Sequence, residues 1–131
     1  MRKCFKFAKE NSSSLGIVYR PIAKVGLRDA GGELFELSML VDSGADITVL
    51  SKRIGDIMGV NVEEGEAKVF RGIVGEMIAY VHKIPLSING KEIETRVAFA
   101  LSEVPNLLGR LDIFKNFEIS FRKEEDFCFC D

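Results

Sequence analysis

Residues 39–51 of the 131-residue chain read MLVDSGADITVLS. Two apolar runs, residues 39–41 and 47–50, flank a turn of small and polar residues. Apolar and β-branched runs of this length predict two buried strands, and Gly44 allows the backbone to turn tightly between them. Asp42 then stands at the end of a buried strand, where a carboxylate is costly unless hydrogen bonds satisfy it or a function requires it.

Two interpretations of Asp42 stay open on this stretch alone. In the first, the side chain bonds its own backbone in an ordinary Asx-turn, for which Asp-Ser-Gly is a common composition. In the second, the carboxylate is placed there for its chemistry. The wider sequence favours the second interpretation.

A second motif lies downstream, where residues 107–110 read LLGR. Together and in this order, the DSGA of residues 42–45 and the LLGR motif resemble the retroviral-type (retropepsin-like) aspartic proteases, over roughly residues 17–121. That family carries Asp-Thr/Ser-Gly-Ala once per subunit and an apolar-apolar-Gly-Arg signature before a short C-terminal helix. The resemblance implies a mainly-β fold, a closed retropepsin-like β-barrel with a flap hairpin and short helices, active as a symmetric homodimer.

Length and composition agree with one globular domain. The chain is too short for the two homologous lobes of a single-chain aspartic protease. Its 47% apolar and 29% charged residues are ordinary for a globular domain, and a net charge of −2 gives no field for nucleic acid. No apolar run has the length of a membrane span, and the N-terminus lacks an apolar signal core. We therefore expect no nucleic-acid or membrane partner and a cytoplasmic location.

The cysteines and the single histidine predict no metal site. Cys4, Cys128 and Cys130 are an odd number at the two chain ends, which favours reduced thiols. Cys-Phe-Cys is too tight for a zinc knuckle, and His82 has no second histidine beside it. We expect no cofactor, and a structural or surface role for His82.

Three segments are expected. Residues 1–14, basic and then polar, predict an N-terminal tail or dimer arm. Residues 15–122 form the protease-like domain. Residues 123–131 join a charged link to an apolar end with no evident place in the core. In the family the chain ends of two subunits interleave, so this end is a possible dimer-interface strand; a frayed tail is the alternative.

Periodicity predicts the elements of the central domain. Alternation over residues 17–27 and 35–41 indicates a hairpin through the turn at 29–32, with Pro21 marking an edge or bulge. Ser51 begins a short helix that Gly59 ends. The remaining predictions are a strand pair over residues 65–88, a hairpin turn at Asn89-Gly90, a helix over 111–116 and a last strand over 117–121.

The chemistry of a carboxylate protease requires two carboxyl groups, one acting as base and one as acid. This chain supplies one motif. The active site must therefore combine Asp42 from two identical subunits on a twofold axis, where repulsion leaves one shared proton. The dyad would activate a water that attacks the carbonyl of a peptide or protein substrate. The resulting prediction is an aspartic endopeptidase without metal or cofactor.

The resemblance also implies supporting roles near Asp42. The Ser43 hydroxyl would bond across the axis to the other subunit, and Gly44, followed by Ala45, would contact substrate backbone. A bidentate pair between Asp46 and Arg110 would tie the loop to the C-terminal helix. Asp46 as a solvent-facing turn charge is the alternative.

Two further substrate contacts follow from the resemblance. Leu107 would line a side-chain pocket, although a plain core leucine is as consistent with its position. Gly72, Ile73 and Val74 sit where the family has its mobile flap, whose closure excludes water from the dyad. Val74 departs from the glycine-rich flap pattern, and a plain hairpin turn is the alternative.

Two other functions remain open. One is a non-catalytic retropepsin-like module for dimerisation or peptide binding. The other is a single-subunit β-barrel in which Asp42 has only a structural role.

Overall fold

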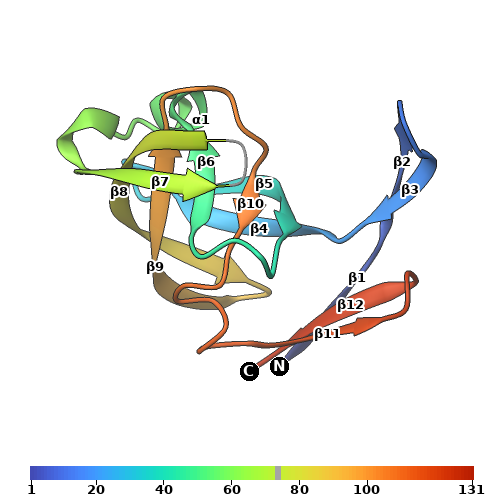
Figure 1. Cartoon of the computed structure of the whole chain (residues 1–131). Helices are drawn as coiled ribbons and strands as arrows, with labels where there is room; N and C mark the ends of the chain where they lie inside the picture. Colours follow the sequence, from blue (N-terminus) through green and yellow to red (C-terminus); the bar gives the residue numbers. More distant parts are fainter. Residues whose placement is uncertain (73–74) are drawn as a thin grey trace.

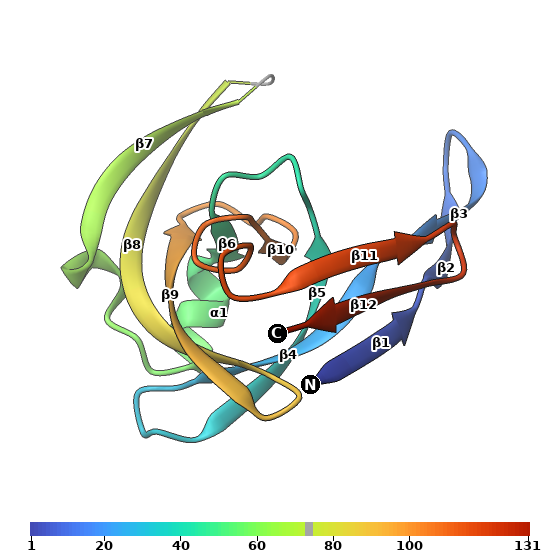
Figure 2. The same cartoon turned by 90° about the horizontal axis from the view of Figure 1, so that it is seen from below.

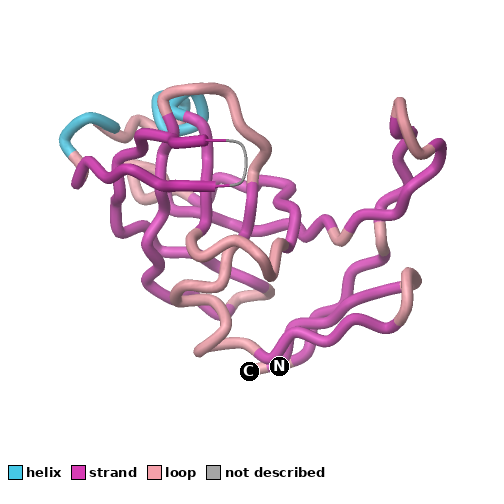
Figure 3. The backbone as a smooth tube through the Cα atoms, in the orientation of Figure 1, coloured by secondary structure: helices cyan, strands magenta, loops and turns pink. Residues whose placement is uncertain are grey.

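Strands dominate the computed structural model, which describes residues 1–72 and 75–131 (Figure 3). In chain order the elements are β1 (Arg2–Lys6), β2 (Ala8–Ser12), β3 (Gly16–Arg20), β4 (Ile22–Arg28), β5 (Leu34–Val41), β6 (Thr48–Ser51), α1 (Lys52–Ile57), the 3-10 helix η1 (Val62–Glu64), β7 (Glu66–Gly72), β8 (Gly75–Ile88), β9 (Lys91–Ala100), β10 (Leu107–Leu108), β11 (Glu118–Arg122) and β12 (Asp126–Cys130).

The largest sheet closes into a barrel. Its seven strands run in the order β4-β5-β10-β6-β9-β8-β7, and β4 also pairs with β8. This second pairing, at Gly26↔Ser87 and Leu27↔Leu86, closes six of the strands into a ring and leaves β7 paired with β8 outside it. The barrel occupies the left of Figure 1. The mainly-β prediction is confirmed.

The period-two pattern places the core inside this barrel. Ala23, Val25 and Leu27 of β4 are fully buried, and Met39 of β5 packs with them. Pro21 lies between β3 and β4, so the strand predicted over residues 17–27 is split in two. Since proline cannot donate to a strand ladder, the break falls where the sequence marked an irregularity.

The first predicted helix is present as α1, directly after β6. Ser51 stands at its N-cap, although its side chain makes no capping hydrogen bond. Gly55 lets the helix lie close to the barrel, because a Cβ there would be 2.6 Å from Val62 Cγ2 and 2.9 Å from Phe99 Cδ1.

The second predicted helix is wrong. Residues 111–116 form consecutive turns, with hydrogen bonds such as Phe114 N to Arg110 O at 2.9 Å. Asp112 has φ 68°, in the left-handed region that a right-handed helix excludes. The segment therefore turns back toward the barrel instead of continuing as a helix.

The two chain ends pair with each other in a three-stranded sheet, β1-β12-β11, seen side by side in Figure 2. Cys4 lies opposite Cys128, and Phe5 opposite Phe127. Phe127 and Phe129 are fully buried and join the main core. The expectation that this apolar end has no place in the core is wrong, because alternate residues of β12 face the barrel.

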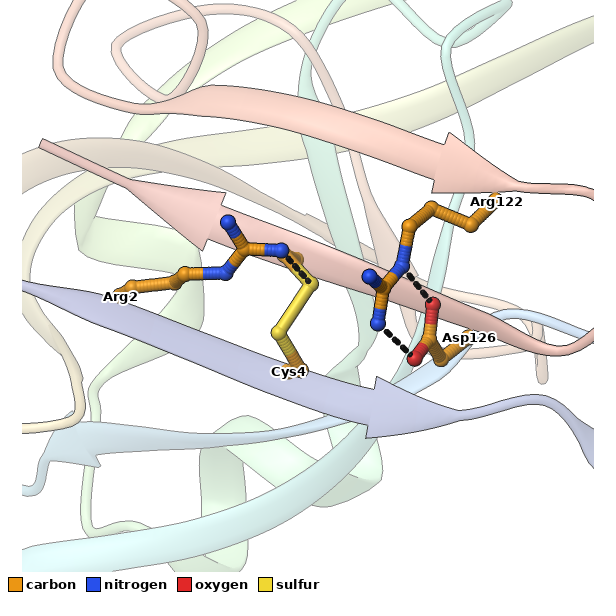
Figure 4. The surroundings of a disulfide bond; sticks show 5 residues. Arg2, Cys4, Arg122 and Asp126 are labelled. Carbon is orange, nitrogen blue, oxygen red and sulfur yellow. Dashed lines mark hydrogen bonds and ion pairs between the residues drawn. A yellow bond between two sulfur atoms is a disulfide. The ribbon is translucent and has the colours of Figure 1, made fainter.

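A disulfide joins Cys4 to Cys128, with an S–S distance of 2.10 Å (Figure 4). Arg2 Nη2 lies 3.6 Å from Cys128 Sγ. The bond corrects the expectation of three reduced thiols and removes the cysteine argument for a cytoplasmic location; Cys130 alone is free. Within the described residues, none of the helices has the length and apolar character of a membrane span.

Removing this disulfide should destabilise the fold. The two cysteines are 124 residues apart, and closing a long loop restricts the unfolded chain most. We expect the double variant Cys4→Ser/Cys128→Ser to lose about 2–4 kcal/mol of unfolding free energy. Denaturant unfolding without reductant measures this. Cys130→Ser serves as the control and should leave stability unchanged; equal stability of the double variant and the wild type would contradict the expectation.

Candidate active site

Asp42 follows the last residue of β5 and opens the loop that leads to β6. Its backbone N donates to Leu108 O at 3.0 Å, and its carbonyl accepts from Ala45 N at 3.1 Å. The side chain is half-buried, and its Oδ1 accepts from Gly44 N at 2.9 Å. The Asx-turn of the first interpretation is therefore present, and it fixes the direction of the Asp42 carboxylate.

Gly44 lies close to this carboxylate. A Cβ at Gly44 would lie 3.2 Å from Asp42 Oδ1, tighter than nine in ten Cβ contacts. A side chain at this position would therefore displace the carboxylate by a few tenths of an ångström.

The segment after β10 clamps the Asp42 loop from one side. Arg110 N donates to Ala45 O at 3.0 Å, and Leu111 N donates to Asp46 O at 2.9 Å. Together with the bond from Asp42 N, these hydrogen bonds hold the start and end of the loop. The two sequence motifs, far apart in the chain, thus form one hydrogen-bonded unit.

Gly109 allows this close approach. Its N donates to the buried Thr48 Oγ1 at 3.1 Å. A Cβ at Gly109 would lie 2.4 Å from both the carbonyl carbon and the oxygen of Ile47. Since these are backbone atoms, any side chain at this position forces the two segments apart.

Arg110 divides its guanidinium between two partners. Nη1 donates to Ser43 O at 2.7 Å, and Nη2 contacts Asp46 Oδ1. The predicted pairing of Asp46 with Arg110 is present, but the predicted bidentate geometry is wrong, because one arm of the fork holds the Ser43 carbonyl. Asp46 keeps 87% of its side chain exposed, so the pair orients the loop more than it adds stability.

The buried carboxylate of Asp112, paired with the part-exposed Arg96, anchors the segment that follows Arg110. Asp112 accepts from Arg96 N at 2.9 Å, Arg96 Nε at 3.0 Å and Arg96 Nη2 at 3.0 Å. These hydrogen bonds lower the pKa of Asp112 to about 2, against the opposing effect of burial. The turn after the clamp is therefore tied to β9.

A cleft of about 860 Å³ opens beside the Asp42 loop. Gly44, Ala45 and Asp46 form one wall, and β7 and the start of β8 form another. Its apolar lining consists of Ile47, Val49, Phe70, Met77, Ile78, Leu101 and Val104. An apolar cleft with a carboxylate at its edge suits a substrate with apolar side chains.

Comparisons with known proteins agree with this geometry. No family model and no curated protein matches the sequence. A solved retropepsin-like aspartic protease from Rickettsia conorii superposes with a TM-score of 0.65 at 15% identity, covering 97% of this chain and 98% of that one. The EIAV protease complexed with the inhibitor HBY-793 superposes with a TM-score of 0.58 at 25% identity, covering 74% of this chain and 86% of that one. The chain has the retropepsin fold.

Within this retropepsin fold, some of the predicted site residues come together and others do not. The Asp42 loop and Arg110 come together as described above. Leu107 is half-buried and packs behind the cleft against Ile47 and Val49, so the plain core interpretation fits it better. Gly72 ends β7 at the predicted flap, while Ile73 and Val74 lie outside the described residues.

Sequence reasoning missed most of the apolar lining of the retropepsin cleft. Phe70 and Met77 face each other across β7 and β8, symmetrically about the Gly72–Gly75 pair. That symmetry around the glycines was a usable signal. Leu101 comes from the loop after β9, and its position depends on tertiary packing alone.

His82 has a structural role, as predicted. Its Nε2 lies 2.8 Å from Val62 O, and its ring packs edge-on against Phe99. It borders a separate cavity of about 380 Å³ that does not reach the Asp42 loop. Within residues 1–72 and 75–131, no cluster of three potential metal ligands occurs.

Substituting Gly109 should open the clamp. Gly109→Ala would place a methyl group against the Ile47 backbone, so we expect a loss of about 3 kcal/mol in unfolding free energy. Denaturant unfolding measures it. Gly31→Ala is the matched control, since its nearest contact would be Asp29 Oδ1 at 3.4 Å. A similarly small loss of unfolding free energy in both variants would show that Gly109 does not pack tightly against the Ile47 backbone.

The Asp112 anchor predicts a pH dependence. Its folded-state pKa of about 2 lies below the ordinary 3.8, so the stabilisation is present above pH about 4 and is lost as the pH falls through about 2. Asparagine also tolerates this left-handed backbone. Asp112→Asn should lower the unfolding free energy by about 2 kcal/mol at pH 7 and make it less dependent on pH in acid. Unfolding measured between pH 2 and 7 tests both effects.

Asp56→Asn is the control for this experiment, because Asp56 forms an exposed pair with Lys52 on α1. It should leave the acid profile unchanged. An unaltered profile in Asp112→Asn would contradict the anchoring role of Asp112.

Proposed function

We propose that the chain is an aspartic endopeptidase whose active site forms from Asp42 of two identical subunits. The observation that carries this proposal is the state of the two carboxylates in the loop. Asp46 is engaged by Arg110, whereas the Asp42 carboxylate is oriented by the amide of Gly44, a residue that lines the cleft. Acid–base cleavage of a peptide needs two carboxyl groups, so the counterpart of Asp42 is the same residue of a second copy.

The two carboxyl groups would hold one proton between them. The charged Asp42 takes a proton from a water, and the resulting hydroxide attacks the carbonyl carbon of the scissile peptide. The protonated Asp42 gives its proton to the carbonyl oxygen. The Asp42 that took the water proton then gives it to the leaving amine as the C–N bond breaks, and the other Asp42 takes a proton from a hydroxyl of the tetrahedral intermediate, which restores the one shared proton. No metal or covalent intermediate takes part in this scheme.

The surrounding residues support this chemistry. Arg110 holds the Ser43 carbonyl and leaves the exposed Ser43 side chain to reach across the twofold axis. The apolar lining of the cleft would bind the side chains of an extended peptide and exclude water from the dyad. The β7–β8 hairpin would serve as the flap over the substrate. The retropepsin fold and an inhibitor-bound neighbour agree with this assignment.

Replacing the carboxylate tests the proposal. Asp42→Asn should abolish peptide cleavage while the protein stays folded and dimeric, because the amide cannot act as a base. Cleavage of a peptide library and sedimentation measure the two properties. The matched control is Asp29→Asn. Asp29 Oδ1 accepts from Gly31 N at 2.9 Å in a similar turn outside the cleft, so this variant should remain fully active.

Full activity in Asp42→Asn, or activity of a strictly monomeric wild type, would refute the endopeptidase proposal. The binding-module alternative predicts a different result with a tetrahedral-mimic inhibitor. A working dyad should bind such a mimic far more tightly than it binds a peptide of the same sequence. Equal affinities would favour the module.

A further inference from the structure

The β2–β3 hairpin has no partner in the described chain. It forms a two-stranded sheet of its own, separate from the barrel sheet and from the terminal sheet. Figure 1 shows it at the right, apart from the barrel. An isolated two-stranded hairpin is marginally stable in water. A projecting hairpin of this kind would therefore be stabilised by packing against another surface.

The two faces of the hairpin differ in chemistry. Tyr19 pairs with Lys9, and Ile17 pairs with Asn11, so Ile17 and Tyr19 share one face. The other face carries the half-buried Val18 beside an ion pair, Arg20 Nε to Glu10 Oε2 at 2.8 Å. The first face therefore holds the large apolar side chains that are left exposed, and Leu15 in the turn is exposed as well.

The chain ends are already occupied within one copy. In the described residues β12 has β1 on one edge and β11 on the other, and the disulfide fixes β1 in place. The N-terminal amine also pairs with Asp131. Exchange of these ends between two subunits would have to undo all of these contacts, so in the described residues this sheet offers a second copy only the outer edges of β1 and β11.

The Asp42 loop alone is too small for a dimer interface. A stable protein interface buries about 800 Å² per partner, some 20–30 residues a side, whereas the loop comprises residues 42–46. In Figure 2 the β2–β3 turn extends toward the same edge of the view as the loop between β5 and β6. A second copy seated against the Asp42 loop therefore lies on the side to which the hairpin reaches.

We propose that the β2–β3 hairpin is an arm that packs its Ile17–Tyr19 face against a second copy of this chain. The proposal rests on the endopeptidase function, which supplies the dimer. Twofold symmetry makes the contact reciprocal, so each arm docks on the other copy and every substitution acts twice. The arm would supply contact area between the two copies that the chain ends, paired within each copy, do not supply.

Two matched double variants test this. Ile17→Thr/Tyr19→Thr removes the apolar face and keeps residues that favour strands. Leu34→Thr/Ile57→Thr is the control, since Leu34 and Ile57 are 49% and 58% exposed on the barrel, against 53% and 45% for Ile17 and Tyr19. We expect the arm variant to raise the dimer dissociation constant at least about tenfold, since two hydrophobic contacts are lost in each copy. Sedimentation equilibrium measures it, and the control should match the wild type.

Activity and hydrogen exchange provide independent readouts. Peptide cleavage by the arm variant should fall at low protein concentration and recover at high concentration. In the wild type, the amides of β2 and β3 should become more protected as the concentration rises through the dissociation constant. The exchange measurement needs no variant, so misfolding of the arm variant does not affect it.

The outcomes separate the two proposals. A wild-type dissociation constant for the arm variant, with unchanged exchange in β2 and β3, overturns the arm and points to an interface elsewhere, such as the free edges of β1 and β11. A monomeric wild type also overturns it. A dimer that depends on the arm but cleaves no peptide supports the arm and refutes the endopeptidase.

Discussion

The close approach of Gly109 to the backbone at Ile47 is the constraint on which the active-site geometry depends. Only a residue without a side chain lets the segment after β10 run against the Asp42 loop. Once there, its amides and carbonyls hold Asp42, Ala45 and Asp46 by the backbone. A carboxylate held by main-chain hydrogen bonds keeps its direction without support from other charges, which suits the proposed site built from two copies.

Much of this arrangement could be predicted from local patterns. The period-two alternation of apolar residues identified β4 and β5, and Asn89-Gly90 adopts φ values of 48° and 84°, as a two-residue hairpin requires. The predicted pairing of Asp46 with Arg110 indicated that the DSGA and LLGR motifs would meet, as they do. Ser51 marked the start of α1 correctly.

The errors arose where distant residues decide the backbone. Asp112 turns left-handed because Arg96 on β9 holds its side chain, and a sequence window over residues 111–116 contains no trace of that partner. The pairing of Cys4 with Cys128 likewise has no spacing signal, since 124 residues separate them. The cleft lining combines residues from several elements, and only the closed barrel brings them to one wall.

The pairing of β1 with β12 makes the backbone nearly circular. Met1 and Asp131 lie next to each other at one end of an antiparallel ladder, and a covalent bond already crosses that ladder. A short peptide linker could therefore join the two termini, and the chain could be reopened at an exposed turn, such as residues 13–15, without altering the barrel. A circular permutant of this kind would have its new termini at the β2–β3 turn, away from the β1–β12 ladder that holds the present termini together.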